Sequence, residues 1–297
     1  MGIDLNAAQL LIKEHKNGLS FGRMATLGRQ GLHANRPALI SVLRESGYKL
    51  SKDRIRKLLD PTMQYSEDFF SLLGAEKIVA IDASDYEGAQ VIHDMNRQIP
   101  KTMVSSFDLV LDSGTLEHIF DFPSALRNAV QMVHPNGRFI SITMANNFCG
   151  HGFYQFSPEL YYRFLCPANG YVMESCIVWE DIPGTKFYRV PDPDILRSRI
   201  DLTSEFGTYM LVKANRLGDM SREFIPQQSD YLRLWTGPEA VAPQRSALDK
   251  LTSALKGIRP LRSAFVALNA KARYRRLRIK RNARRILVPL NDLRVLR

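Results

Sequence analysis

The chain has 297 residues, of which 45% are hydrophobic and 24% are charged. This composition is ordinary for a globular protein and excludes collagen-like and wholly disordered chains. No stretch approaches the roughly 20 apolar residues of a membrane span, and the N-terminus lacks the basic and apolar segments of a signal peptide. Three widely spaced cysteines do not make a disulfide framework. We therefore expect a cytoplasmic protein.

The net charge of +11 is unevenly distributed. Residues 241–297 hold 16 lysines and arginines against two acidic residues, whereas residues 1–240 hold 25 basic and 28 acidic residues. The chain is therefore expected to consist of a near-neutral body (residues 1–226), a linker (227–240) and a basic helical or partly disordered tail (241–297).

The basic tail has three alternative interpretations. Its apolar residues recur at three- and four-residue steps from Leu251 to Leu268, which is typical of an amphipathic helix. Such a helix would bind an anionic membrane surface, placing the protein at the inner membrane face. The same charge would attract the phosphates of nucleic acid. The third alternative is a solvated tail without a partner.

Expected strands and helices alternate along the body, which predicts an α/β fold around a mainly parallel sheet. The expected strands are 24–27, 77–82, 89–92, 107–112, 138–143, 172–179 and 208–214. The expected helices are 37–46, 122–133 and one that begins at Ser157-Pro158-Glu159; residues 182–204 form an exposed insertion.

Glycine and acidic residues follow the first four expected strands. These residues are Gly28, Asp82, Asp94 and the segment Asp112-Ser113-Gly114. Ligands of parallel sheets bind beyond the carboxyl ends of the strands. A carboxylate there can accept both hydroxyls of a ribose, and a glycine lets the backbone approach a ligand. The alternatives are that Asp82 caps the following segment and that Asp94 caps its own loop.

The segment from residue 107 to 145 resembles class I S-adenosylmethionine-dependent methyltransferases. It reads Asp-Leu-Val-Leu-Asp-Ser-Gly-Thr-Leu-Glu-His-Ile, then an amphipathic helix, then His-Pro-Asn-Gly-Arg-Phe-Ile. The strand order extends the resemblance to about residues 22–215. Residues 147–159, Asn-Phe-Cys-Gly-His-Gly-Phe-Tyr-Gln-Phe-Ser-Pro-Glu, are similar to bacterial methyltransferase-like proteins of sugar and surface-polysaccharide pathways.

This resemblance implies a Rossmann-like sheet of about seven strands with helices on both faces, extended here by the basic C-terminal segment. It implies S-adenosylmethionine as cofactor and methyl transfer to an oxygen of a sugar or another small molecule. By position, Gly28 would lie under the methionine part, Asp82 would bind the ribose and Asp94 would face the adenine amino group. The transferred methyl would be bordered by Asp112, Ser113 and Gly114.

The first loop departs from the family pattern. Of a glycine-rich loop only Gly28 and Gly31 remain, and Asp82 follows Gly28 by 54 positions, where about 20 is usual. An insertion of about one helix and a loop would explain the spacing, and so would loss of cofactor binding. The alternatives to an enzyme are a degenerate methyltransferase fold that acts as a binding or scaffold protein and a nucleic-acid-binding protein that uses the basic tail.

Two histidines are candidates for the catalytic base. Methyl transfer to oxygen requires removal of one proton, and a side chain with a pKa near 6.5 suits that task. His118 and His151 both fall on loops expected at the ligand edge. Alternatively, His118 orients its loop and His151 is a turn residue. Some ubiquinone-pathway O-methyltransferases carry a metal-binding glutamate where this chain has Gly114, so no metal site is expected.

Overall fold

The computed structural model describes residues 2–197, 200, 203–221, 223–236 and 288–289. The predicted basic tail therefore lies outside the described residues, apart from residues 288–289. Among the helices in the described part of the chain, none is both long and apolar enough to cross a membrane.

Nine strands of the described residues form one sheet, with the spatial order β11-β9-β8-β10-β7-β6-β2-β4-β5. The five strands from β5 to β7 are parallel, and β10 is antiparallel to both of its neighbours. This arrangement confirms the predicted α/β fold. The strands are β2 (Arg23–Leu27), β4 (Lys77–Asp82), β5 (Val91–Ile92), β6 (Phe107–Ser113), β7 (Val133–Asn146), β8 (Tyr171–Glu180), β9 (Tyr188–Arg189), β10 (Thr208–Arg216) and β11 (Val288–Pro289).

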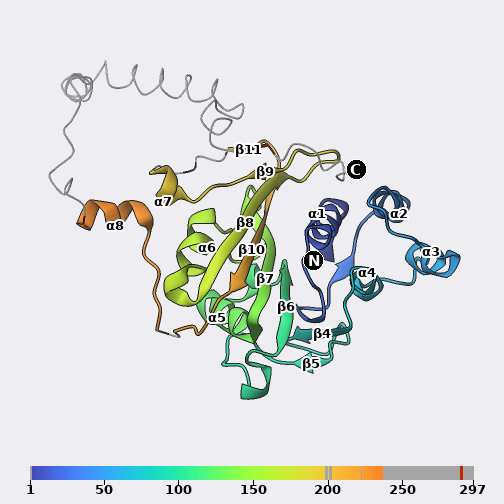
Figure 1. The fold of residues 1–297 in the computed structure, drawn as a ribbon, viewed down its shortest axis with the longest axis horizontal. Coiled ribbons are helices and arrows are strands. Elements are labelled where there is room, and N and C mark those ends of the chain that lie inside the picture. Colours follow the sequence, from blue (N-terminus) through green and yellow to red (C-terminus); the bar gives the residue numbers. More distant parts are fainter. Residues whose placement is uncertain (1, 198–199, 201–202, 222, 237–287, 290–297) are drawn as a thin grey trace, which may run out of the picture.

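Helices cover both faces of this sheet (Figure 1). One face carries α5 (Phe122–Met132) and α6 (Pro158–Phe164), and the other carries α1 (Leu5–Lys16), α2 (Arg36–Glu45), α3 (Lys52–Leu59) and α4 (Glu67–Leu72). In β6, Val110 packs in the core on the α5 side, whereas Leu109 and Leu111 pack in the core on the α1 side. Strands buried on both faces read as continuous apolar runs, which is why the sequence revealed them.

The long spacing between Gly28 and Asp82 comes from a helical insertion. The connection holds β3 (Gly31–Leu32), α2, α3 and α4; one helix is the usual crossover between parallel strands, so two helices are additional where about one helix and a loop were expected. Two of these helices start at side-chain caps, where Asn35 accepts from the backbone N–H of Ala38 and Ser51 accepts from that of Arg54. The insertion therefore lengthens the connection from β2 to β4 without changing which strands pair.

Several elements lie where the sequence did not predict them. A two-residue strand, β1 (Gly2–Ile3), pairs with β3 (Gly31–Leu32), and α1 follows it. Helix α8 (Ser229–Thr236) forms inside the range expected to be a linker, and α7 (Pro193–Leu196) and β9 lie in the expected insertion. Ser157 precedes α6 as expected, but its side chain makes no capping hydrogen bond.

A largely buried ion pair fastens α1 to the sheet. Lys213 Nζ of β10 lies 2.5 Å from Glu14 Oε2 of α1 and 3.2 Å from Glu174 Oε2 of β8. A charge removed from water needs such a partner, because leaving it unpaired costs several kcal/mol.

We expect the Glu14→Gln substitution to lower the free energy of unfolding by about 1–3 kcal/mol, because Lys213 keeps only Glu174 as a charged partner. Chemical denaturation measures this change. The exposed Glu76 provides the control: Glu76→Gln should leave stability unchanged, and an equal effect of both substitutions would contradict the role of the pair.

Candidate active site

The strand order reverses between β2 and β6, since β4 and β5 extend the sheet from one side of this pair and β7 extends it from the other. Ligands of open α/β sheets bind in the crevice outside the carboxyl ends of the strands at such a point. Gly28 follows β2 here with φ +70°. A Cβ on it would lie 2.9 Å from Thr115 Oγ1 and 3.7 Å from Asp82 Oδ2, so only glycine fits.

Asp82 ends β4 with its carboxylate on the Gly28 side. Its Oδ1 accepts one long hydrogen bond, 3.4 Å, from the backbone N–H of Ser84. Its backbone oxygen accepts from His93 N at 2.7 Å, which holds the end of β5 beside it. The structure thus brings Gly28 and Asp82 together, as the ribose-site prediction requires.

Asp94 lies two residues beyond β5, and its carboxylate is engaged within its own loop. Asp94 Oδ1 accepts from Asn96 N at 3.0 Å and from Asn96 Nδ2 at 2.7 Å, and Oδ2 lies 3.6 Å from Arg97 Nε. The Asn96 side-chain hydrogen bond is the main reason that the pKa of Asp94 is lowered. This geometry favours the loop-capping alternative, and the contact with adenine stays a prediction.

Two residues that the sequence did not single out complete the loop after β2. Gln30 is buried; its Nε2 donates to Leu27 O at 2.5 Å, and its Oε1 has no partner among the described residues. Arg29 Nε lies 2.7 Å from Glu67 Oε1, and its guanidinium lies over the ring of Tyr65 at 3.9 Å. Arg29 therefore closes the outer wall of the loop against α4.

Asp112 lies inside the core rather than at the crevice. It is fully buried: Oδ2 accepts from Ser141 Oγ at 2.7 Å, and Oδ1 accepts from the backbone N–H groups of Thr115 and Leu116. Burial raises the pKa of this carboxyl group. Its geometry is that of a positioning residue for the following turn, and its place beside a transferred methyl stays a prediction.

Glu117 is a second buried acid on the 3₁₀ turn η2 (Leu116–His118). Thr143 Oγ1 donates to its Oε2 at 3.3 Å, while Oε1 has no partner in the part of the chain that the structure describes. Burial, followed by the charge of Asp112, raises the pKa of Glu117. Glu117 lies in the Leu-Glu-His motif of the sequence, but the burial of its side chain depends on tertiary contacts.

The aromatic loop (residues 147–156) packs against η2. The backbone N–H groups of Phe153 and Tyr154 donate to Glu117 O at 2.8 and 3.2 Å. Gly152 has φ +72°, and a Cβ on it would lie 2.9 Å from the same oxygen, so a side chain there would separate loop and turn. This close approach brings the rings of His118 and His151 to 5.0 Å, edge to face.

The two predicted base candidates thus form a pair at the surface of the carboxyl edge. Partial burial, followed by the charge of His151, lowers the pKa of His118. A histidine with a lowered pKa is neutral at pH 7 and can accept a proton.

The edge pocket, a cavity of about 240 Å³, opens at the carboxyl ends of β6 and β8 and beside the start of β10. Its lining includes the predicted residues Ser113 and Gly114, and Gly28, Asp82, Asp94, His118 and His151 do not line it. The lining residues are Gly2, Asp4, Ala7, His33, Ser113, Gly114, Ile142, Trp179, Asp181 and Tyr209.

The edge pocket is acidic and aromatic. Burial, with the charge of Asp181 adding to it, raises the pKa of Asp4, and burial raises the pKa of Tyr209 to about 12. Phe148 of the aromatic loop lies 4.8 Å from the ring of Tyr209 and 6.5 Å from that of His151. The loop therefore connects the histidine pair with the pocket.

Residues 65–141 match the family model described as a methyltransferase domain. The matched residues are thus similar to a methyltransferase domain over about a quarter of the chain. The matched span includes Asp82, η2 and the first part of β7, and it begins after the loop of Gly28. It confirms the resemblance to the S-adenosylmethionine-dependent methyltransferases, whose cofactor is S-adenosylmethionine. Among curated proteins, none matches the chain in sequence.

Similar solved structures include enzymes of two kinds. The 1,6-didemethyltoxoflavin-N1-methyltransferase of Burkholderia thailandensis is 14% identical, with 71% of this chain and 77% of that chain covered and a TM-score of 0.37. The N-methyltransferase NodS of Bradyrhizobium japonicum is 10% identical (72% and 87% covered, TM-score 0.38). The branched-chain polyamine synthase of Thermus thermophilus is 12% identical (75% and 59% covered, TM-score 0.38). Scores this low assign no activity, so the fold rests on the strand order of the sheet itself.

The buried acids Asp112 and Glu117 predict an unusual pH dependence of stability. A carboxyl group whose pKa is raised on folding stays protonated in the native state while the unfolded chain ionises. Stability should therefore fall as the pH rises above about 4.5, by up to about 1.4 kcal/mol per pH unit for one group. Glu117→Gln should flatten this slope in denaturation measured between about pH 5 and 8. An unchanged slope would contradict it, and Glu76→Gln is the control.

Proposed function

We propose that the protein transfers a methyl group from S-adenosylmethionine to an oxygen of a small molecule, such as a sugar, in the cytoplasm. The observation that carries this proposal is the close approach of Gly28 and Asp82 at the point where the strand order reverses. The methyltransferase match includes the second of these residues, and the crevice is where α/β sheets bind nucleosides.

The residues of this crevice fit an adenosyl cofactor. The Asp82 carboxylate is partly exposed and offers two acceptor oxygens for the ribose hydroxyls. Because Gly28 has no Cβ, Thr115 Oγ1 and the Asp82 carboxylate can lie close to its backbone. When bound, S-adenosylmethionine would supply a methyl group on a cationic sulfur, from which an oxygen nucleophile could take the methyl and leave S-adenosylhomocysteine.

The edge pocket suits a hydroxyl-bearing acceptor. The carboxylates of Asp4 and Asp181 accept hydrogen bonds, the hydroxyl of Tyr209 can donate or accept, and the ring of Trp179 provides an apolar wall. A volume of about 240 Å³ admits one small molecule or one sugar unit. The polar lining supports a sugar as the acceptor more than it supports an apolar compound.

The histidine pair supplies the base in this proposal. His118 is neutral at pH 7 because its pKa is lowered. It would take the proton of an acceptor hydroxyl that extends from the edge pocket toward the histidine pair, directly or through one water, as the oxygen–methyl bond forms and the sulfur–methyl bond breaks. His151, held at 5.0 Å, is a positioning residue or an alternative acceptor of that proton. Glu117 fixes the aromatic loop through its backbone oxygen and keeps both rings in place.

The two other classes of function make different predictions. A degenerate fold that acts as a scaffold would bind neither S-adenosylmethionine nor S-adenosylhomocysteine. A protein whose role is nucleic-acid binding through the basic tail would bind RNA in proportion to the charge of residues 241–297.

Substitution of the ribose ligand tests the cofactor site. We expect Asp82→Asn to weaken S-adenosylhomocysteine binding about 10- to 100-fold in calorimetry, because the lost hydrogen bonds involve a charged acceptor. Asp85→Asn changes an exposed acid three residues further along the same loop and should bind like the parent. No heat from the parent protein at millimolar ligand would favour the degenerate fold.

The pH profile tests the base. The acceptor would first be found in a panel of sugars and other small alcohols. On this acceptor, kcat/KM should increase with pH in the acidic range and reach its plateau before about pH 6.5, since the pKa of His118 is lowered from that value. His118→Asn should reduce kcat about 100- to 10,000-fold and remove this limb. A profile and rate like those of the parent would exclude His118 as the base, and His151→Asn, tested in parallel, would then identify or exclude its partner.

A further inference from the structure

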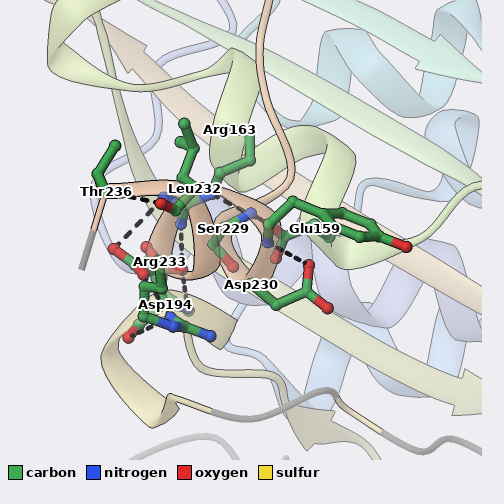
Figure 2. A network of polar contacts seen from close by, with 10 residues as sticks. Glu159, Arg163, Asp194, Ser229, Asp230, Leu232, Arg233 and Thr236 are labelled. Atoms are coloured by element: carbon green, nitrogen blue, oxygen red, sulfur yellow. Dashed lines mark hydrogen bonds and ion pairs between the residues drawn. The ribbon is translucent and has the colours of Figure 1, made fainter. Parts of the chain in front are cut away.

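Polar contacts fix one side of helix α8 against the body of the protein (Figure 2). The backbone N–H of Ser229 donates to Glu159 Oε1 at 2.6 Å, and Arg233 Nη1 lies 2.5 Å from Asp194 Oδ1. Arg163 lies between these contacts, 3.6 Å from Glu159 and 3.8 Å from Asp194. The orientation of α8 about its axis is therefore set by α6 and α7.

This orientation leaves apolar side chains of α8 uncovered by the described residues. Tyr231, Leu234 and Trp235 are spaced as one helix face and are all exposed. The rings of Tyr231 and Trp235 stack at 5.7 Å, and the exposed fraction of Trp235 is 61%. We call Tyr231, Leu234 and Trp235 the α8 apolar face.

The sequence that follows α8 identifies the kind of partner. Residues 241–297, which begin five positions after Thr236, carry 16 basic and two acidic residues. A partner that satisfies both features must be anionic and must also accept apolar side chains. The phosphates of RNA match the charge, but the aliphatic side chain of Leu234 cannot stack on a base. A bilayer with anionic headgroups matches both, because tryptophan and tyrosine partition into the headgroup region.

We propose that the α8 apolar face is a docking surface for an anionic lipid bilayer. Trp235 enters the headgroup region, and the net positive charge of the sequence that follows α8 favours a bilayer of opposite charge. A weak apolar contact combined with a weak electrostatic attraction gives stable yet reversible attachment. The proposal does not depend on methyl transfer, so its test does not depend on the proposed activity either.

The two tryptophans of the chain make the contact directly observable. Trp179 is 1% exposed, whereas Trp235 lies on the α8 apolar face. In the full-length Trp179→Phe variant, all tryptophan emission therefore comes from Trp235. Vesicles of phosphatidylcholine mixed equally with phosphatidylglycerol should shift this emission to the blue and protect it from acrylamide, and vesicles of phosphatidylcholine alone should do neither.

The Trp235→Phe variant is the control for Trp179→Phe, and it also keeps the test possible if Trp179→Phe does not fold. In Trp235→Phe, the emission of the buried Trp179 should stay unchanged on addition of the same vesicles. If Trp179→Phe does not fold, the difference between the parent and Trp235→Phe gives the same signal.

Co-sedimentation with the same vesicles tests the contribution of the α8 apolar face to binding. Replacement of Tyr231, Leu234 and Trp235 together by serine should weaken partitioning at least about ten-fold. Leu59→Ser, at an exposed leucine of the remote helix α3, should have no effect.

Three results would overturn the proposal. The first is no binding of the parent to anionic vesicles. The second is binding without a change in Trp235 emission, which would assign attachment to residues 241–297 alone. The third is a shift of Trp235 emission by RNA but not by vesicles, which would make nucleic acid the partner.

Discussion

A single backbone carbonyl, that of Leu27, joins the parts on which the candidate site depends. It accepts from Thr115 Oγ1 at 2.7 Å and from Gln30 Nε2 at 2.5 Å, and the next residue, Gly28, donates its N–H to Ile81 O at 2.7 Å. The ends of β2, β4 and β6 are thereby held together. Because Gly28 has no Cβ, the three ends can approach closely enough for Asp82 to face the crevice.

Two buried acids, Asp112 and Glu117, position the segments that carry the histidine pair. The Asp112 carboxylate accepts hydrogen bonds from the backbone at the start of η2. The backbone oxygen of Glu117 in turn accepts hydrogen bonds from the aromatic loop. The two histidines meet because of these contacts, although they lie 33 positions apart in the sequence. The polar interior is therefore a support for the surface chemistry, and its cost is the burial of two carboxyl groups.

The sequence predicted the features that depend on local pattern. Strands 77–82 and 107–112 are continuous apolar runs, and the helix of residues 122–133 has a clear apolar face, so β4, β6 and α5 were found within about one residue of their ends. Helix α1 was missed although its signal is present, since Asp4 caps it and Ala7, Ala8, Leu11 and Ile12 recur at helical spacing. The edge pocket could not be predicted, since Asp4, His33, Asp181 and Tyr209 come together only through tertiary contacts.

The large insertion after β2 also has a consequence for how the protein folds. Strand β2 pairs with Lys77 and its neighbours, 54 positions away, and with Leu109 and its neighbours, 85 positions away. Closing such long loops costs entropy before any strand contact compensates for it, and chains dominated by non-local pairing fold slowly. Among the parallel strand pairs of the sheet, β2 and β6 at its centre therefore join the most distant segments, whereas the antiparallel pair β8 and β10 joins residues only 28 to 45 positions apart. The strand ends that carry the candidate site are therefore expected to come together late in folding.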